Sequence, residues 1–452
     1  MHDESQDTLI IGIVGVLLVG VLLLSMAPPW LDLVERLQSG PGFALERPKV
    51  DYLTGTLWAL ALTVVVAVWG KMVRLQRPLL LAWAAKVVIA QVAMPFYDFT
   101  YGLDPDGYFG NAASSGFSPS GLELGQGTTN MHQLVWVHVR WLSSSFSATR
   151  LSFALLGLIS VFLVYRAGVA ILGRENKRLF YVLALTPSIL FWSSILGKDP
   201  VSLFSVSCYL YGAATWYRSR RASSLPWVAL GVCVALFLRV WLGPILLLPF
   251  AVLATFEVRS GFARLLCVAA AVATLVLGPA VIQTASAHDV SSSAGVLQTA
   301  SDVSQSFDAG GSSRDVREIR TFSDLTVFAP LGIFTVLFRP LPGEVRNVFG
   351  TLAGVENLLL LFVAIRAVAR TRVGDLRDPI VLWLGSILLM WGLVYSVAAS
   401  QNLGTASRYR LEITPLLIGF LLYMGRGRER EVTTSAVAVV RARAAMRPSW
   451  TA

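Results

Sequence analysis

Long apolar runs constrain the fold of this chain more than any other feature. Twelve of them reach or approach the roughly 20 residues that an α-helix needs to cross a bilayer. They lie near residues 8–27, 53–70, 78–95, 149–172, 178–196, 200–217, 226–241, 242–257, 262–284, 349–368, 379–398 and 411–424. Only 14% of the 452 residues are charged and 55% are hydrophobic, a composition that excludes an ordinary soluble domain. We therefore predict an all-α integral membrane protein, a polytopic bundle of about 12 transmembrane helices.

The positions of Lys and Arg predict how the bundle is oriented. Short basic loops are retained on the cytoplasmic side of a membrane. Six alternate connections hold more than half of the 37 Lys and Arg residues: 71–77, 173–178, 217–221, 258–264, 366–377 and 425–447. We therefore expect both termini to be cytoplasmic and two long loops, 96–148 and 285–348, to be extracytoplasmic. The net charge of +10 then reflects orientation, and no nucleic-acid partner is expected.

The same reading divides the chain into a transmembrane domain, residues 1–424, and a basic cytoplasmic tail, residues 425–452. One further apolar run, 326–338, is short and ends at the sequence Arg-Pro-Leu-Pro. Counting it as a span would place the later basic segments outside the cytoplasm. We therefore interpret it as a re-entrant or interfacial segment.

Acidic residues gather in the first long loop, in the sequence PFYDFTYGLDPDGYFGNAASSG. It contains Asp98, Asp104, Asp106 and Tyr108. Clustered carboxylates can act as general bases, raise one another's pKa or bind a divalent cation. The sequence Asp-Pro-Asp-Gly is also typical of a β-turn, so a purely structural role for these residues stays open.

Charged residues also stand at the predicted extracytoplasmic ends of several spans. They are Lys198, Asp199, Arg239, Arg339, Arg408 and Arg410. Charges near bilayer depth are costly and tend to mark function, and guanidinium groups bind phosphate well. The set predicts a cationic pocket for phosphate or pyrophosphate. The alternatives are that Asp199 caps a helix before Pro200 and that each cation is only an interfacial anchor.

The first-loop residues resemble a known family. Asp104, Tyr108 and Ala112 are similar to the D-x-x-x-Y-x-x-x-A pattern of GT-C superfamily glycosyltransferases, which are polytopic membrane enzymes. The strings PSILFWSSILGKDP, LFRPLPGEVRNVFGTLAGVEN and NLGTASRYRLEITP resemble bacterial polysaccharide-locus membrane proteins described as GT-C-like or as polymerases. The resemblance covers residues 100–420 in order.

This resemblance implies a glycosyltransferase in a bacterial inner membrane. The donor would be a polyprenyl-phosphate-linked sugar and the acceptor a lipid-linked or cell-envelope glycan, with membrane lipids as further partners. Asp104 would be the catalytic base and Asp106 its neighbour. The implied donor-phosphate contacts are Lys198, Arg239, Arg339, Arg408 and Arg410, and the same substrate site would include Asp98, Tyr108 and Asp199. Pro105 replaces the second acid of the commoner Asp-Glu pair, so the need for a divalent cation stays open.

Other function classes remain open at this point. A polymerase or ligase for lipid-linked oligosaccharides would share the arginine-rich face but would need no aspartate in the first loop. A polysaccharide export or transport protein would need charges deep within the spans, whose interiors we expect to be nearly free of them. A non-catalytic membrane scaffold is the third alternative.

Overall fold

The chain folds into an all-helical bundle. The computed structural model describes residues 2–39, 45–101, 104–114, 121–286, 295, 297–299, 301–302 and 321–426. Every element in this part of the chain is a helix. The predicted all-α class is therefore confirmed. Apart from residues 425 and 426, the predicted tail lies outside the described residues, as do parts of both long loops.

Seven helices of the described part are long and apolar enough to cross a membrane. They are α1 (His2–Met26), α3 (Pro48–Met72), the continuous helix made of α4 (Gln76–Val88), the π-helical turn η1 (Ile89–Ala93) and α5 (Met94–Tyr101), α8 (Phe146–Leu172), α14 (Gly261–Ser286), α17 (Val348–Arg370) and α18 (Pro379–Ala399). The protein is accordingly a helical membrane protein, because such helices bury their own backbone hydrogen bonds and present apolar side chains to lipid.

The remaining elements are shorter or more polar helices. They are α2 (Pro28–Gln38), α6 (Pro105–Ala113), α7 (Gly127–Trp141), α9 (Lys177–Leu185), α10 (Pro187–Trp192), α11 (Lys198–Ser219), η2 (Ala222–Ser224), α12 (Leu225–Leu238), α13 (Leu242–Glu257), α16 (Phe322–Phe338), η3 (Val373–Arg377), α19 (Leu403–Tyr409), η4 (Arg410–Glu412) and α20 (Thr414–Met424). The predicted single span over 178–196 is divided into α9 and α10, because Pro187 has no N–H to continue the helix.

Side-chain caps fix where several helices begin and end. The Ser145 hydroxyl accepts a hydrogen bond from the Ala148 N–H at the start of α8, and Gly173 ends that helix with φ 68°. Asn347 and Asp378 cap α17 and α18 in the same way. Such caps satisfy backbone groups that a helix end leaves without partners.

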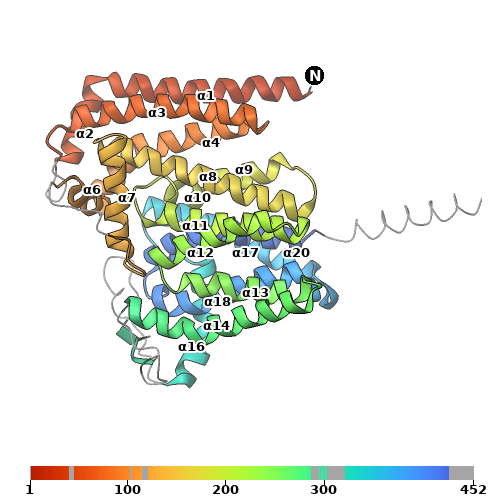
Figure 1. Ribbon diagram of the computed structural model, residues 1–452. Helices are drawn as coiled ribbons and strands as arrows, with labels where there is room; N and C mark the ends of the chain where they lie inside the picture. The colour runs from red at the N-terminus through yellow and green to blue at the C-terminus, as the bar shows by residue number, and fades with distance from the viewer. Residues whose placement is uncertain are drawn as a thin grey trace, which may run out of the picture.

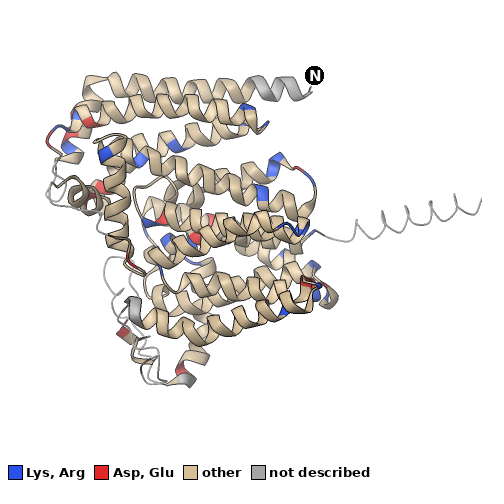
Figure 2. Ribbon diagram, viewed as in Figure 1, with Lys and Arg blue, Asp and Glu red and all other residues tan. Residues whose placement is uncertain are grey.

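The long helices lie side by side, and α6 and α7 lie across one end of the bundle (Figure 1). We call this the α7 end. Figure 2 shows most charged residues near the two ends of the helices. The opposite end, which we call the basic end, holds the connections that follow α3, α8, α11, α13 and α17 (Figure 1). These connections carry exposed cations, among them Lys71, Arg174, Arg220, Arg259 and Arg370. The described start of the chain lies at this same end (Figure 1).

Candidate functional site

A small hydrophobic cluster holds α6 and α7 against the bundle. It is separate from the main core and consists of Tyr108, Phe109, Ala112, Met131, Val135, Phe146, Phe153, Leu196, Val201 and Leu238. The start of α7 lies so close to the end of α12 that a Cβ at Gly127 would clash with the carbonyl oxygen of Leu238. The Asn130 amide also donates to the Phe237 carbonyl, at 2.6 Å. The first-loop helices are thus fixed over the ends of α8, α11 and α12.

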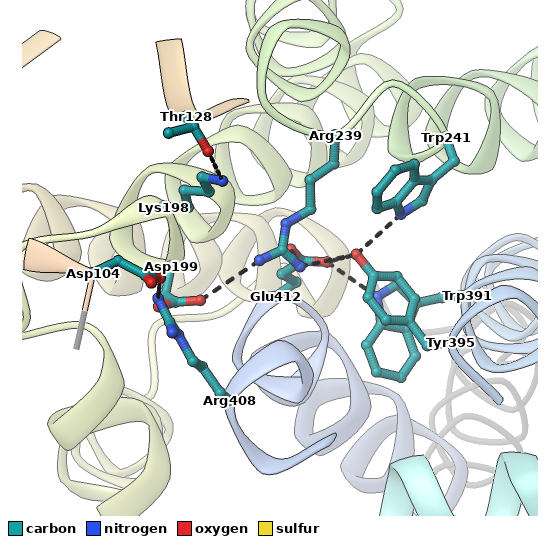
Figure 3. Close-up of polar contacts among 10 residues, drawn as sticks. All are labelled: Asp104, Thr128, Lys198, Asp199, Arg239, Trp241, Trp391, Tyr395, Arg408 and Glu412. Atoms are coloured by element: carbon teal, nitrogen blue, oxygen red, sulfur yellow. Dashed lines mark hydrogen bonds and ion pairs between the residues drawn. The ribbon is translucent and has the colours of Figure 1, made fainter. Parts of the chain in front are cut away.

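Four charged side chains from three distant segments form one chain of contacts beneath these helices (Figure 3). Arg408 Nε donates to Asp199 Oδ2 at 2.7 Å. Asp199 Oδ1 lies 3.7 Å from Arg239 Nη2, and Arg239 Nη1 lies 2.7 Å from Glu412 Oε1. The two carboxylates are each only 1% exposed. The sequence-predicted residues Asp199, Arg239 and Arg408 are therefore brought together, and the two buried acids neutralise the two arginines.

Aromatic side chains complete the buried part of this network (Figure 3). The Tyr395 hydroxyl donates to Glu412 Oε2 at 2.8 Å and accepts from Arg239 Nη1 at 3.1 Å. Trp391 also donates to Glu412, at 3.2 Å, and the Arg239 guanidinium lies 4.0 Å from the centre of the Tyr409 ring. Hydrogen bonds to a buried ion pair offset part of the cost of removing its charges from water, and here they reach Glu412 Oε2. The guanidinium group of Arg239 therefore makes its contacts with Glu412, Tyr395 and Tyr409 of the protein.

Three charged residues form the accessible edge of the network, which we call the rim: Asp104, Lys198 and Arg408. Arg408 Nη2 lies 3.3 Å from Asp104 Oδ2, and the Asp104 side chain is 58% exposed against 18% for Arg408. Lys198 Nζ donates to the Thr128 hydroxyl at 2.7 Å and lies 5.9 Å from the centre of the Tyr108 ring. The rim offers two cations for an anion and one solvated carboxylate for a proton.

The other two aspartates of the first loop, Asp98 and Asp106, lie at a different place. Arg150 makes an ion pair with Asp98. Asp106 is half-buried, and its Oδ1 has no hydrogen-bond partner among the described residues. Burial, and then the nearby charge of Asp98, raise the pKa of Asp106 to about 7, while Arg150 acts in the opposite direction. Asp104 and Asp106 are two positions apart at a helix start, roughly 200° around the axis, so they do not face one another as a pair.

Two of the predicted phosphate contacts point elsewhere. Arg339 Nε donates to Glu344 Oε2 at 2.9 Å. Arg410 is fully buried, and its Nη1 donates to the carbonyls of Leu337 and Arg339, each at 3.1 Å. Arg410 therefore holds the end of α16. The expectation that all five cations line one pocket needs correction, because these two guanidinium groups make their contacts outside the network.

Sequence reasoning missed several residues of this region. Glu412, Tyr395 and Trp391 complete the network, yet only Glu412 carries a signal, because it is an acid at the edge of an apolar run. The expectation that span interiors are nearly free of charge is wrong at Lys86 and Glu356, which are both buried. The sequence LAWAAKVVIAQVA shows the lysine plainly. The lack of interior charges therefore no longer speaks against a transporter.

Lys86 supports the turn that leads to the rim. Its Nζ donates to the Ser193 carbonyl at 3.0 Å and to the hydroxyls of Ser193 and Ser194. These serines follow α10, and the chain reaches Lys198 four residues later. A cation at the carbonyl end of a helix is favourable. Lys86 therefore ties α4 to the segment that positions Lys198 and Asp199.

The described residues offer no group of three or more His, Cys, Asp and Glu side chains that could hold a metal ion. The two histidines of α7 have other neighbours. His138 lies 2.8 Å from the Ser152 hydroxyl and 3.0 Å from that of Thr149, and His132 lies 3.3 Å from the Asn111 amide. Both histidines therefore have polar neighbours within the protein.

Comparison with known proteins does not assign the chain to a family, because no family model, curated protein or solved structure matches it. The resemblance to GT-C glycosyltransferases rests on the short motifs alone. Any functional conclusion therefore depends on the rim and on the network that supports it.

Proposed function

We propose that the protein is a membrane glycosyltransferase that moves a sugar from a polyprenyl-phosphate donor to a lipid-linked or cell-envelope acceptor. The observation that carries the proposal is the rim, where Asp104, Lys198 and Arg408 meet from three distant parts of the chain. Two cations beside one solvated carboxylate suit a reaction in which a phosphate leaves while a hydroxyl loses its proton.

The proposed setting is a bundle of about 12 spans in a bacterial inner membrane, with both termini cytoplasmic. Five predicted cytoplasmic connections gather at the basic end, whereas Lys198 of the rim contacts Thr128 of α7 at the opposite end (Figure 1). Because short basic loops stay in the cytoplasm, the rim would face the extracytoplasmic side. That is the side on which a lipid-linked sugar is used once it has crossed the membrane.

The proposed reaction is a direct displacement at the anomeric carbon. The acceptor oxygen forms a bond to that carbon, the bond from carbon to the phosphate oxygen breaks, and Asp104 takes the acceptor proton. Polyprenyl phosphate leaves with the bonding electrons. Arg408 and Lys198 stabilise its charge, and Asp199 with Arg239 and Glu412 holds the Arg408 guanidinium in place.

Replacing Asp104 by Asn tests the base. The purified protein in lipid nanodiscs is given a panel of polyprenyl-phosphate-linked sugars together with a cell-envelope lipid and glycan extract as acceptor, with and without a chelator, and released polyprenyl phosphate is measured. We expect Asp104→Asn to abolish release, because the amide cannot accept the proton. Glu123→Gln is the matched control, since Glu123 is an exposed acid of the same loop and should leave the rate unchanged. Full activity of Asp104→Asn would remove Asp104 as the base.

Asp106 is the alternative base within the same proposal. A carboxyl with a pKa near 7 is well matched to proton transfer at neutral pH. If Asp106→Asn lost activity and Asp104→Asn kept it, Asp106 would be the catalytic base. The phosphate-binding side of the proposal would stand in that case, because it depends on Lys198 and Arg408.

A polymerase or ligase for lipid-linked oligosaccharides is the second candidate. The observation in its favour is that Arg408 makes its close contact with Asp199, at 2.7 Å, and only a longer one with the exposed Asp104, at 3.3 Å. The cation network is thus complete without the first loop. Loss of polymer in Arg408→Ala together with normal polymer length in Asp104→Asn would favour this reading. Uptake of labelled lipid-linked sugar without covalent transfer would instead favour a transporter.

A further inference from the structure

A long apolar groove lies away from the rim, between α8 and α9 on one side and α20 on the other. Its volume is about 340 Å³, within the range of ligand-binding cavities. Leu210 and Trp383 form part of its wall, and Gly419 of α20 lies along it. None of its lining residues belongs to the network around Arg408.

Three arginines surround the groove where it reaches the basic end: Arg174, Arg178 and Arg426. Arg174 and Arg178 are exposed and make no ion pair with a described residue. The nearest acid in sequence, Glu175, lies 3.3 Å from Arg166 instead. Arg426 lies 3.2 Å from Asp378 and stacks on the Tyr423 ring. The mouth of the groove therefore carries an excess of positive charge.

The apolar wall has the length of one membrane leaflet. The groove follows α20 from Pro415 to Arg426, and the 11 residues of this helix span roughly 16 Å. This is about half of the 30 Å hydrocarbon core of a bilayer. An apolar channel of this depth that ends in arginines matches a lipid tail joined to an anionic head group.

We propose that this groove binds an anionic phospholipid of the leaflet at the basic end. Its phosphate contacts Arg174 and Arg178, and one acyl chain lies along α20 beside Gly419. Guanidinium groups bind phosphate in a bidentate manner, and basic residues near a membrane surface attract anionic lipids. A zwitterionic lipid fills the same apolar space but gains less from the unpaired charge.

A second groove gives an internal comparison. It lies between α13 and α18, has a volume of about 540 Å³, and reaches the same end of the bundle. Its mouth carries Glu257 as well as Arg377, and Glu257 makes an ion pair with Arg220. Because its charges are mixed, this groove is expected to accept lipids without selecting anionic ones.

The charge requirement is tested by native mass spectrometry of the full chain. Phosphatidylglycerol and phosphatidylcholine with the same acyl chains are titrated into the detergent-solubilised protein. We expect phosphatidylglycerol to bind about tenfold more tightly and the double variant Arg174→Gln/Arg178→Gln to lose this preference. The matched control is Lys71→Gln/Arg259→Gln, which removes two exposed cations of the basic end that do not line the groove. The proposal would be overturned if Arg174→Gln/Arg178→Gln preferred phosphatidylglycerol as strongly as the control variant does.

The position of the acyl chain is tested by filling the groove. A Cβ at Gly419 would meet no atom within 4 Å, so Gly419→Leu should fold and extend into the groove. We expect this variant to bind phosphatidylglycerol more weakly although every arginine is kept. Unchanged binding would show that the lipid only adsorbs at the surface and would refute the groove as its site.

Two competitors distinguish the sources of the phosphate. Soluble glycerol 3-phosphate should not displace phosphatidylglycerol, because it lacks the chain that fills the groove. Displacement by it would show a free-phosphate site. Undecaprenyl phosphate should compete no better than phosphatidylglycerol. If it bound much more tightly, and only with Arg174 and Arg178 present, the groove would belong to a polyprenyl lipid and the phospholipid proposal would be wrong.

Discussion

Two pairs of arginines, one at each end of the bundle, are held in opposite ways. At the α7 end, Arg239 and Arg408 are held by buried carboxylates, and the charges almost cancel. At the basic end, Arg174 and Arg178 are exposed and have no ion-pair partner among the described residues. A guanidinium fixed by buried partners can hold a group in one geometry, whereas an exposed one supplies mainly attraction. The difference separates a candidate reaction site from a candidate lipid-binding surface.

The largest effect is expected from removing Glu412. Glu412→Ala leaves Arg239 buried without its close partner, which costs about 3–5 kcal/mol of unfolding free energy. Thermal unfolding in detergent measures the loss. The surface pair at the basic end is the control, because Glu175→Ala removes an exposed partner of Arg166 and should cost less than ~1 kcal/mol. Similar losses of unfolding free energy in Glu412→Ala and Glu175→Ala would show that the two ion pairs do not differ in their contribution to stability.

Replacing Arg408 by Lys keeps the charge but not the geometry. An ammonium group cannot contact Asp199 and Asp104 at once as the guanidinium does. We expect the rate of polyprenyl phosphate release to fall about tenfold to a hundredfold, with little change in stability. Arg174→Lys at the basic end should leave this rate unaltered. An unimpaired Arg408→Lys protein would mean that charge alone matters at the rim.

The pH dependence of stability gives a smaller effect at the α7 end. Burial raises the pKa of Asp106 in the folded protein to about 7, above the ~4 of an unfolded aspartate. The folded state then holds this proton more tightly. Its contribution is complete below about pH 4 and is lost as the pH rises through about 7. The melting temperature of Asp106→Asn relative to the unsubstituted protein should therefore rise by a few degrees between pH 4 and 8. A constant difference would contradict the raised pKa.

The smallest change in stability is expected at Lys86. Lys86→Met fills similar space with an apolar chain. It removes a buried cation that contacts Ser193 and Ser194 and makes no ion pair with a described acid. We expect stability to stay within ~1 kcal/mol, while release of polyprenyl phosphate falls several-fold because the turn before Lys198 loosens. Normal activity in a stable Lys86→Met protein would limit Lys86 to packing.

The fold class could be predicted from sequence because lipid imposes a strong local rule. Apolar stretches of span length mark α1, α3, α8, α17 and α18 well, since every backbone group of such a stretch must be bonded within its own helix. The division of 178–196 at Pro187 was less clear, because a proline can also stand within a membrane helix. Pro187 is visible in the sequence, but whether it divides the helix depends on the neighbouring helices.

The candidate site was predictable only in part. Residue type identified Asp104, Lys198 and Arg408, because charges at the ends of apolar runs are rare. The partner of each charge is set by tertiary packing. Arg410 stands two positions after Arg408, yet it contacts backbone carbonyls and not the network. Local sequence carries no information on which of two neighbouring arginines faces a distant acid.

The separate hydrophobic cluster beneath α6 and α7 has a consequence for how such a protein can diversify. Helices α6 and α7 rest on their own small core, while Arg239 and Glu412 are anchored in the bundle. Under the proposed function, these two helices are an exchangeable module. Grafting another sequence onto the same contact residues would alter acceptor choice and leave the donor-holding machinery intact.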